Sequence, residues 1–135
     1  MSLENLAARK LIHAEPNNGQ ETNNLIRAAR DRLQDASNTS LTFASRFDLA
    51  YNAAYGLALA ALRTAGYRTS KRYLVFQCLS HTAEINQSEI RLLSNCHEKR
   101  NLAEYEGHFD VDEPLLEVLI EITAKLDSQL QGQHD

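Results

Sequence analysis

The chain has few of the residues that form tight turns: its 135 residues include five glycines and two prolines. A sandwich or barrel of many short strands needs more of this turn chemistry, so an all-β fold is nearly excluded. Two cysteines, Cys78 and Cys96, are too few for a disulfide framework and are typical of a reducing compartment. The length is that of one ordinary domain, and we expect residues 1–135 to form a single one.

Long hydrophobic runs are also missing. The longest apolar stretch, Leu49 to Leu62, has 14 residues and contains Asn52, whereas a helix needs about 20 apolar residues to cross a bilayer. The start of the chain, Met1 to Asn5, is polar and lacks the apolar core of a signal peptide. We therefore expect a cytoplasmic protein with no membrane contact.

The chain as a whole has no excess of positive charge, since its formal net charge is −4. This argues against a protein that coats nucleic acid by bulk electrostatic attraction. The charge is unevenly distributed, however. Residues 1–100 carry 13 Lys/Arg and 9 Asp/Glu, a net charge of +4, and residues 101–135 carry 1 and 9, a net charge of −8. The sequence therefore allows a local basic surface, followed by an acidic segment.

Helical patterns dominate what is present. Apolar residues recur at steps of three or four in six segments, and this spacing predicts helices. The expected helices cover about residues 3–14, 21–36, 40–65, 70–79, 88–107 and 112–128. The segment 40–65 is apolar on nearly all sides and rich in alanine, so it should be a central helix that its neighbours approach closely. The fold class that follows is all-α, a bundle of five to six helices.

Metal and cofactor motifs are weak in this sequence. Cys78 and His81, together with Cys96 and His97, are nominally sufficient ligands for zinc. Adjacent residues on a helix point about 100° apart, so Cys96 and His97 cannot both face one ion. A Cys–His nucleophile pair would lack a third group that orients the base. The glycine patterns of phosphate and dinucleotide loops are absent as well. We expect no metal and no cofactor.

A basic stretch at the start of the fourth expected helix is the first candidate for ligand binding. Arg68, Lys71 and Arg72 lie close together in the sequence there. Clustered cations and the free N–H groups of a helix start can receive a phosphate. The alternative is a solvated loop whose charges bind nothing specific.

The second candidate lies late in the fifth expected helix. Arg100 and Asn101 adjoin apolar positions, so at least one of these polar side chains should point inward or into a groove. A buried arginine needs a partner, and Asp48 and Asn52 on the central helix are the natural ones. An Asp48–Arg100 ion pair could fix the register of the bundle. Such a pair is compatible with a functional site in the same place.

Two sets of residues carry a resemblance to a known superfamily. The first resembles the long tyrosine- and alanine-rich helix of HEPN domains, and it consists of Ala50-Tyr51-Asn52-Ala53-Ala54-Tyr55, Ala61-Leu62-Arg63 and Gly66-Tyr67-Arg68. The second, Arg100-Asn101 followed by Tyr105 and Gly107, looks like a variant of the closing motif of the same superfamily. The resemblance covers about residues 40–108, more than half of the chain.

The resemblance implies a compact up-and-down helical bundle that forms a homodimer. It also implies a nucleotidyltransferase-like partner protein and a role with RNA in a prokaryotic toxin–antitoxin or defence system. Catalytic HEPN members are metal-independent endoribonucleases with an arginine and, after four to six residues, a histidine. The arginine stabilises charge on the phosphate while the histidine helps to move protons. In this chain Tyr105 stands where that histidine is expected, and tyrosine is a poor base at neutral pH. His108 follows Arg100 after seven residues and could substitute if the helix unwinds there.

Three hypotheses about function follow. The first is a HEPN-like RNA- or nucleotide-binding protein with weak or lost ribonuclease activity. Its candidate catalytic residues are Arg100, Tyr105 and His108, and its candidate binding residues are Arg100, Asn101, Arg68, Lys71 and Arg72. The second is a non-catalytic dimeric helical module that binds a partner protein, in which Arg100 only pairs with Asp48. The third is an active ribonuclease that uses His108.

Overall fold

A long helix, α3 (Phe43–Thr64), forms the centre of the protein in a computed structural model that describes residues 2–107 and 109–134. Most of its alanines are fully buried, as are Tyr51 and Leu57. The other elements in chain order are α1 (Leu3–Ala8), β1 (His13–Ala14), α2 (Gly19–Ala36), β2 (Tyr67–Arg68), α4 (Arg72–Gln77), α5 (Leu79–Thr82), α6 (Gln87–Glu106) and α7 (Glu113–His134). The prediction of an all-α helical bundle is therefore confirmed.

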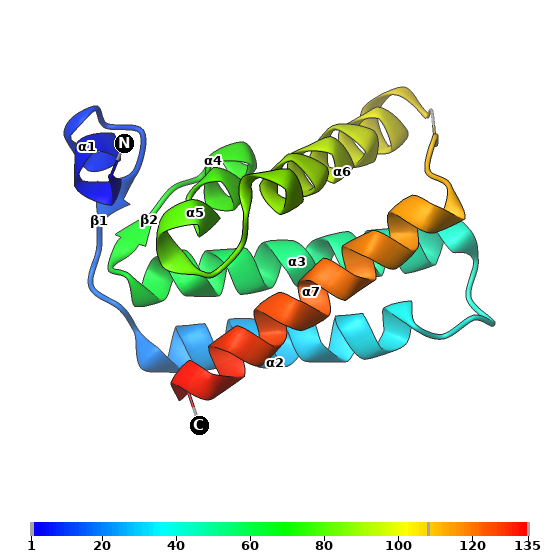
Figure 1. Cartoon of the computed structure of the whole chain (residues 1–135), viewed down its shortest axis with the longest axis horizontal. Coiled ribbons are helices and arrows are strands. Elements are labelled where there is room, and N and C mark those ends of the chain that lie inside the picture. The colour runs from blue at the N-terminus through cyan, green and yellow to red at the C-terminus, as the bar shows by residue number, and fades with distance from the viewer. Residues whose placement is uncertain (1, 108, 135) are drawn as a thin grey trace.

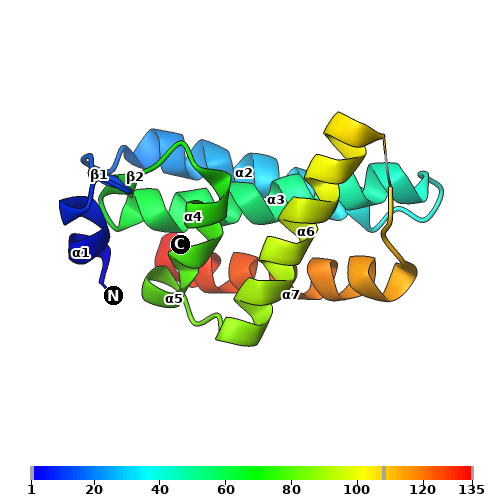
Figure 2. The same ribbon diagram turned by 90° about the horizontal axis from the view of Figure 1, so that it is seen from above.

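The other long helices surround α3. Helices α2 and α7 pack against α3 and against each other, while α4, α5 and α6 cover the remaining side of α3 (Figure 1). Seen from above, α6 crosses α3 obliquely (Figure 2). Small residues allow α2 to lie close to α3, because a Cβ atom on Gly56 would be only 3.6 Å from the Cβ atom of Ala29. The expected central, alanine-rich helix is thus present.

Several helix ends follow from local sequence. Gly66 and Gly107 have φ angles of +92° and +69°, a left-handed backbone that glycine adopts without strain and that ends α3 and α6. Asn86 caps α6 in a reciprocal capping box with Glu89, so the helix begins at Gln87, one residue before the expected start. The side chain of Asp112 accepts a hydrogen bond from the Leu115 N–H, at the expected start of α7.

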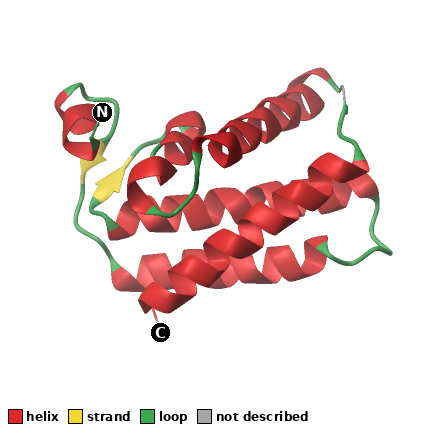
Figure 3. Ribbon diagram, viewed as in Figure 1, coloured by secondary structure: helices red, strands yellow, loops and turns green. Residues whose placement is uncertain are grey.

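The expected helix over residues 3–14 is wrong in its second half. Helix α1 ends at Ala8, Lys10 has a φ angle of +62°, and His13–Ala14 pair with Tyr67–Arg68 as an antiparallel two-stranded sheet (Figure 3). This pairing joins segments more than fifty residues apart, and helical spacing gives no sign of it. The fourth expected helix is also divided, because α4 begins at Arg72 rather than Ser70 and α5 follows it after Cys78.

No helix among the described residues is both long and apolar enough to cross a membrane.

Candidate functional site

A polar cluster lies where α6 crosses α3. The Tyr51 hydroxyl of α3 is 2.9 Å from Nδ1 of His97 on α6, and the two rings are stacked at an interplanar angle of 23°. One turn later on α6, Nδ2 of Asn101 is 3.3 Å from Nε2 of the same imidazole. Both ring nitrogens of His97 are therefore engaged, one by each helix.

These contacts constrain the tautomer of the neutral imidazole. A neutral histidine carries one N–H, so a ring nitrogen that accepts a hydrogen bond leaves the other as donor. If Nε2 of His97 accepts from the Asn101 amide, Nδ1–H donates to the Tyr51 oxygen. The hydroxyl hydrogen of Tyr51 is then available to a further acceptor. The arrangement can therefore offer an O–H donor, an amide donor and a neutral imidazole at one place.

Two arginines from different helices flank the Tyr51 ring. The guanidinium carbon of Arg100 on α6 is 5.6 Å from the ring centroid, and that of Arg72 on α4 is 6.0 Å from it. Arg72 lies closer still to Tyr55, with 4.2 Å between its guanidinium carbon and the ring centroid. Such cation–π contacts hold guanidinium groups in fixed positions without neutralising their charge. We call Tyr51, Arg72, His97, Arg100 and Asn101 the arginine–histidine cluster.

The two arginines differ in how their charge is compensated. Arg72 forms no salt bridge with any residue that the structure describes, and its buried Nη1 has no hydrogen-bond partner there. Nη1 of Arg100 lies 2.6 Å from Oε2 of Glu104, one turn further along α6. The expected Asp48–Arg100 ion pair is therefore wrong. Because Glu104 is within reach on the same helix and is 44% exposed, Arg100 pairs locally instead of across the bundle.

The arginines also affect the ionisation of their neighbours. Burial lowers the pKa of His97, and the positive charges of Arg72 and Arg100 lower it further, so the imidazole is neutral at pH 7. Burial raises the pKa of the Tyr51 hydroxyl, although Arg72 and Arg100 act in the opposite direction. The cluster thus combines two permanent cations with a neutral base. That combination can bind a phosphate and can accept a proton.

Asn52, the other expected partner of Arg100, is not part of this cluster. Its side-chain amide donates to the backbone carbonyl of Asp48, four residues earlier on α3. Asp48 itself is exposed, and its carboxylate makes no hydrogen bond or ion pair with another described residue. Neither residue therefore compensates the charge of Arg100.

The basic stretch expected at the start of the fourth helix is divided by the fold. Arg68 lies in β2, where Glu15 and Glu21 neutralise it at distances of 2.5 and 2.6 Å. The same two glutamates pair with Arg63, a nearly fully buried residue that also donates to three backbone carbonyls. Arg68 and Arg63 therefore tie the N-terminal segment to the end of α3. Of the three predicted binding residues in this stretch, Arg72 joins the cluster, and Lys71 precedes it as an exposed residue.

Tyr105, a predicted catalytic residue, is not part of the cluster. Tyr105 is 76% exposed near the end of α6, away from the buried Tyr51. His108 lies outside the described residues. The histidine that the structure places beside Arg100 is His97, three residues before it, rather than a residue after it.

The sequence contains a signal for His97 that the expected closing motif does not include. His97 precedes Arg100 by three residues and Asn101 by four, so all three share one face of a helix. The patterns that involve His97 in the sequence are a zinc site and a Cys–His nucleophile pair. Its contact with Tyr51 spans 46 residues and could not be deduced from helical spacing.

Metal binding has no support from geometry in the described part of the chain, where no group of three or more His, Cys, Asp or Glu residues could hold an ion. Cys78 and Cys96 are free and buried, and burial raises the pKa of Cys96 to about 12. A thiol with so high a pKa is inert at neutral pH.

Comparisons of the chain with models of protein families, with curated proteins and with solved structures give no match.

Proposed function

We propose that this chain is a HEPN-like protein that binds RNA or a nucleotide and holds one phosphate between Arg72 and Arg100. The observation that carries the proposal is the uncompensated charge of Arg72, which is half-buried and has no salt-bridge partner among the described residues. A buried guanidinium N–H without an acceptor is costly, and an anionic ligand that reached Nη1 after a shift of the surrounding side chains would remove that cost. The sequence resemblance suggests membership of the HEPN superfamily and a role in a prokaryotic toxin–antitoxin or defence system.

A phosphate ester fits the cluster better than a carboxylate does. Guanidinium groups on two helices can contact different oxygens of one phosphate, and arginine suits this bidentate recognition. Glu104 is a weak competitor, because an exposed pair four residues apart on a helix contributes only about 0.3–0.5 kcal/mol. Arg100 can therefore turn from Glu104 to a bound phosphate. Asn101 and the Tyr51 hydroxyl supply uncharged donors nearby.

Ribonuclease chemistry at this cluster would use His97. The imidazole would take the proton of an RNA 2′-hydroxyl, whose oxygen would then bond to phosphorus while the 5′-oxygen leaves with a proton from water. The products would be a 2′,3′-cyclic phosphate and a 5′-hydroxyl, and the arginines would stabilise charge developing on the phosphate. Both nitrogens of His97 are already hydrogen-bonded, however. We therefore propose weak or lost activity, because substrate must first displace Asn101 from Nε2.

The test is binding of a fluorescently labelled single-stranded RNA, followed by anisotropy. Arg72→Met and Arg100→Ala should each weaken binding about tenfold or more, since each removes a charge-assisted contact. Arg91→Ala is the matched control, because Arg91 is an exposed arginine on α6 outside the cluster. Equal effects of Arg91→Ala and Arg100→Ala would contradict a specific site. In EDTA, cyclic-phosphate products that His97→Ala abolishes would identify residual activity and its base.

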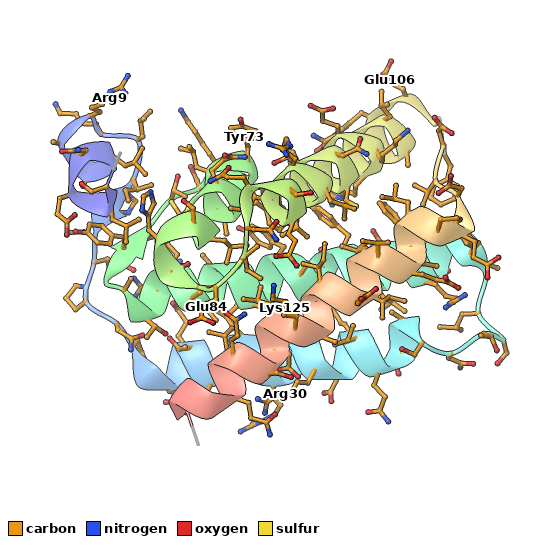
Figure 4. The ribbon with its side chains drawn as sticks, in the orientation of Figure 1. Arg9, Arg30, Tyr73, Glu84, Glu106 and Lys125 are labelled. Atoms are coloured by element: carbon orange, nitrogen blue, oxygen red, sulfur yellow. The ribbon has the colours of Figure 1, made fainter. Side chains whose placement is uncertain are left out.

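A non-catalytic dimeric interaction module is the second candidate function. The observation that favours it is two exposed aromatic residues, Tyr73 at 53% and Tyr105 at 76%, on α4 and α6 respectively. Figure 4 places Tyr73 on the outer side of the α4–α6 layer, away from α2 and α7. Exposed tyrosines are typical of protein interfaces, including those of homodimers. A dimer in sedimentation analysis that Tyr73→Ser and Tyr105→Ser dissociate, without RNA binding, would favour this candidate over the first.

A nucleotidyltransferase-like protein is the partner that the superfamily resemblance suggests. Co-purification with a protein encoded by an adjacent gene would test that partnership.

A further inference from the structure

A pocket adjoins the arginine–histidine cluster on the other side of Arg100. It lies between the first half of α3 and the second half of α6, and its volume is about 350 Å³. Two phenylalanines form its apolar wall, with the Phe47 and Phe109 rings edge to face at a centroid distance of 5.9 Å. The residues facing them from the two helices are Ala44 and Ala103, whose small side chains leave the space open.

The polar side of the pocket holds charges of both signs. Arg100 lines the pocket and also flanks Tyr51, so one guanidinium borders both the pocket and the cluster. Asp48 lines the pocket with a carboxylate that makes no hydrogen bond or ion pair within the described chain. In the free protein Glu104 pairs with Arg100, and because it is 44% exposed it can turn to solvent when a phosphate takes Arg100. Asp48 therefore offers two carboxylate oxygens to a ligand that brings its own donors.

We propose that this pocket binds a guanine base of the ligand whose phosphate lies between Arg72 and Arg100, an inference that rests on the proposed function. A flat aromatic ring suits the space beside Phe47 and Phe109, as in many small-molecule sites with apolar walls and few polar groups. Ligand specificity then depends on Asp48. Guanine carries a ring N–H and an amino group side by side on its Watson–Crick edge, and a carboxylate can accept from both.

The other bases match Asp48 less well. Adenine and cytosine place an amino donor next to a ring nitrogen acceptor, and that acceptor would face a carboxylate oxygen. Uracil places its ring N–H between two carbonyl oxygens, which would also meet the carboxylate unfavourably. A good bidentate contact to a base edge discriminates by about 1–3 kcal/mol, or about 5- to 150-fold in affinity. Unstacked bases of single-stranded RNA expose this edge to proteins.

Calorimetric titration with 3′-mononucleotides tests the inference. Wild-type protein should bind guanosine 3′-phosphate about tenfold or more tightly than the inosine, adenosine or cytidine 3′-phosphates. Inosine lacks only the amino group of guanosine, so the difference in affinity between these two nucleotides measures the contribution of that amino donor. Asp48→Asn should reduce the affinity for the guanosine nucleotide to that for the adenosine nucleotide, without weakening the binding of inorganic phosphate. Asp31→Asn, an exposed aspartate on α2, is the control for net charge.

A second variant tests the pocket independently, in case Asp48→Asn does not fold. Ala44→Leu fills the pocket from an exposed position on α3 and should lower affinity for the guanosine nucleotide without affecting inorganic phosphate. Equal affinity for all four nucleotides, with binding lost in Arg72→Met, would overturn the guanine pocket and leave the phosphate site standing. No binding of any nucleotide, of RNA or of phosphate to wild-type protein would overturn both.

Discussion

Replacing Arg72 should cost the protein little stability, although the residue is half-buried and its side chain packs against Tyr55. Arg72→Met keeps the apolar length of the side chain and removes the guanidinium. The loss of the cation–π contact costs about 0.5–2 kcal/mol. Removing a buried N–H without an acceptor returns about 1–3 kcal/mol, which is the cost of leaving such a group unsatisfied. The two effects nearly cancel, and we expect the free energy of unfolding to change by less than about 1 kcal/mol.

Arg63→Met is the matched comparison, because Arg63 is a buried arginine whose hydrogen bonds are all made inside the chain. Its guanidinium donates to the backbone carbonyls of Glu15, Pro16 and Tyr67. Each such bond contributes about 1 kcal/mol net, and more when the donor is charged, so the substitution should cost about 3 kcal/mol or more. The ion pairs with Glu15 and Glu21 add little, because those carboxylates are 41% and 39% exposed.

Urea unfolding followed by circular dichroism measures both changes on the same scale. A loss in Arg72→Met as large as that in Arg63→Met would refute the reasoning, since it would make Arg72 a structural residue. A small loss of stability in Arg72→Met beside a large loss in Arg63→Met is typical of a binding site, where a charge is kept at the expense of stability.

Three further predictions concern charge and pH. Glu104→Gln should strengthen RNA binding about twofold, because Arg100 no longer pairs with a carboxylate and that exposed pair contributes only about 0.3–0.5 kcal/mol. Glu106→Gln, an exposed control on the same helix, should change RNA binding less. Filter-binding titrations of both variants would decide, and equal effects would contradict release of Arg100. RNA binding should also strengthen as pH falls from neutral toward the pKa of His97, which burial and the two arginines lower in the free protein, because a bound phosphate favours the protonated imidazole. Anisotropy across this range should show a pH dependence that His97→Asn abolishes, and its persistence in that variant would exclude His97. Hydrogen bonds from Arg63 and Arg68 lower the pKa values of Glu21 and Glu15, respectively. The two ionised carboxylates therefore stabilise the fold above about pH 4.5, and this stabilisation is lost as pH falls through the lowered pKa values. The difference in stability between wild type and Glu21→Gln should shrink in acid, and a constant difference would contradict the coupling.

Local sequence patterns predict the bundle well and its polar contacts poorly. The alanine-rich run of α3, the glycines after α3 and α6 and the acidic start of α7 are each encoded within a few residues, and their consequences appear as expected. The pairing of β1 with β2 and the sharing of Glu15 and Glu21 by Arg63 and Arg68 join distant segments. Such pairings depend on which helix faces meet, and spacing within one segment does not determine this.

The candidate site was predictable in part for the same reason. Arg72, Arg100 and Asn101 were identified from their own neighbourhoods, and the structure brings them together around Tyr51. His97 was overlooked because its role depends on a tyrosine from another helix. Arg68 was included in the basic stretch, and only the fold brings two glutamates to it.

The central claim is that a phosphate of the ligand binds between Arg72 and Arg100. The most direct measurement is an NMR titration of ¹⁵N-labelled protein with a short single-stranded RNA, followed through the arginine side-chain Nε–Hε signals and the His97 ring. The account predicts that the signals of Arg72, Arg100 and His97 shift together at the lowest RNA concentrations. Shifts confined to exposed arginines elsewhere, such as Arg27 and Arg91, or no shifts at all, would contradict it.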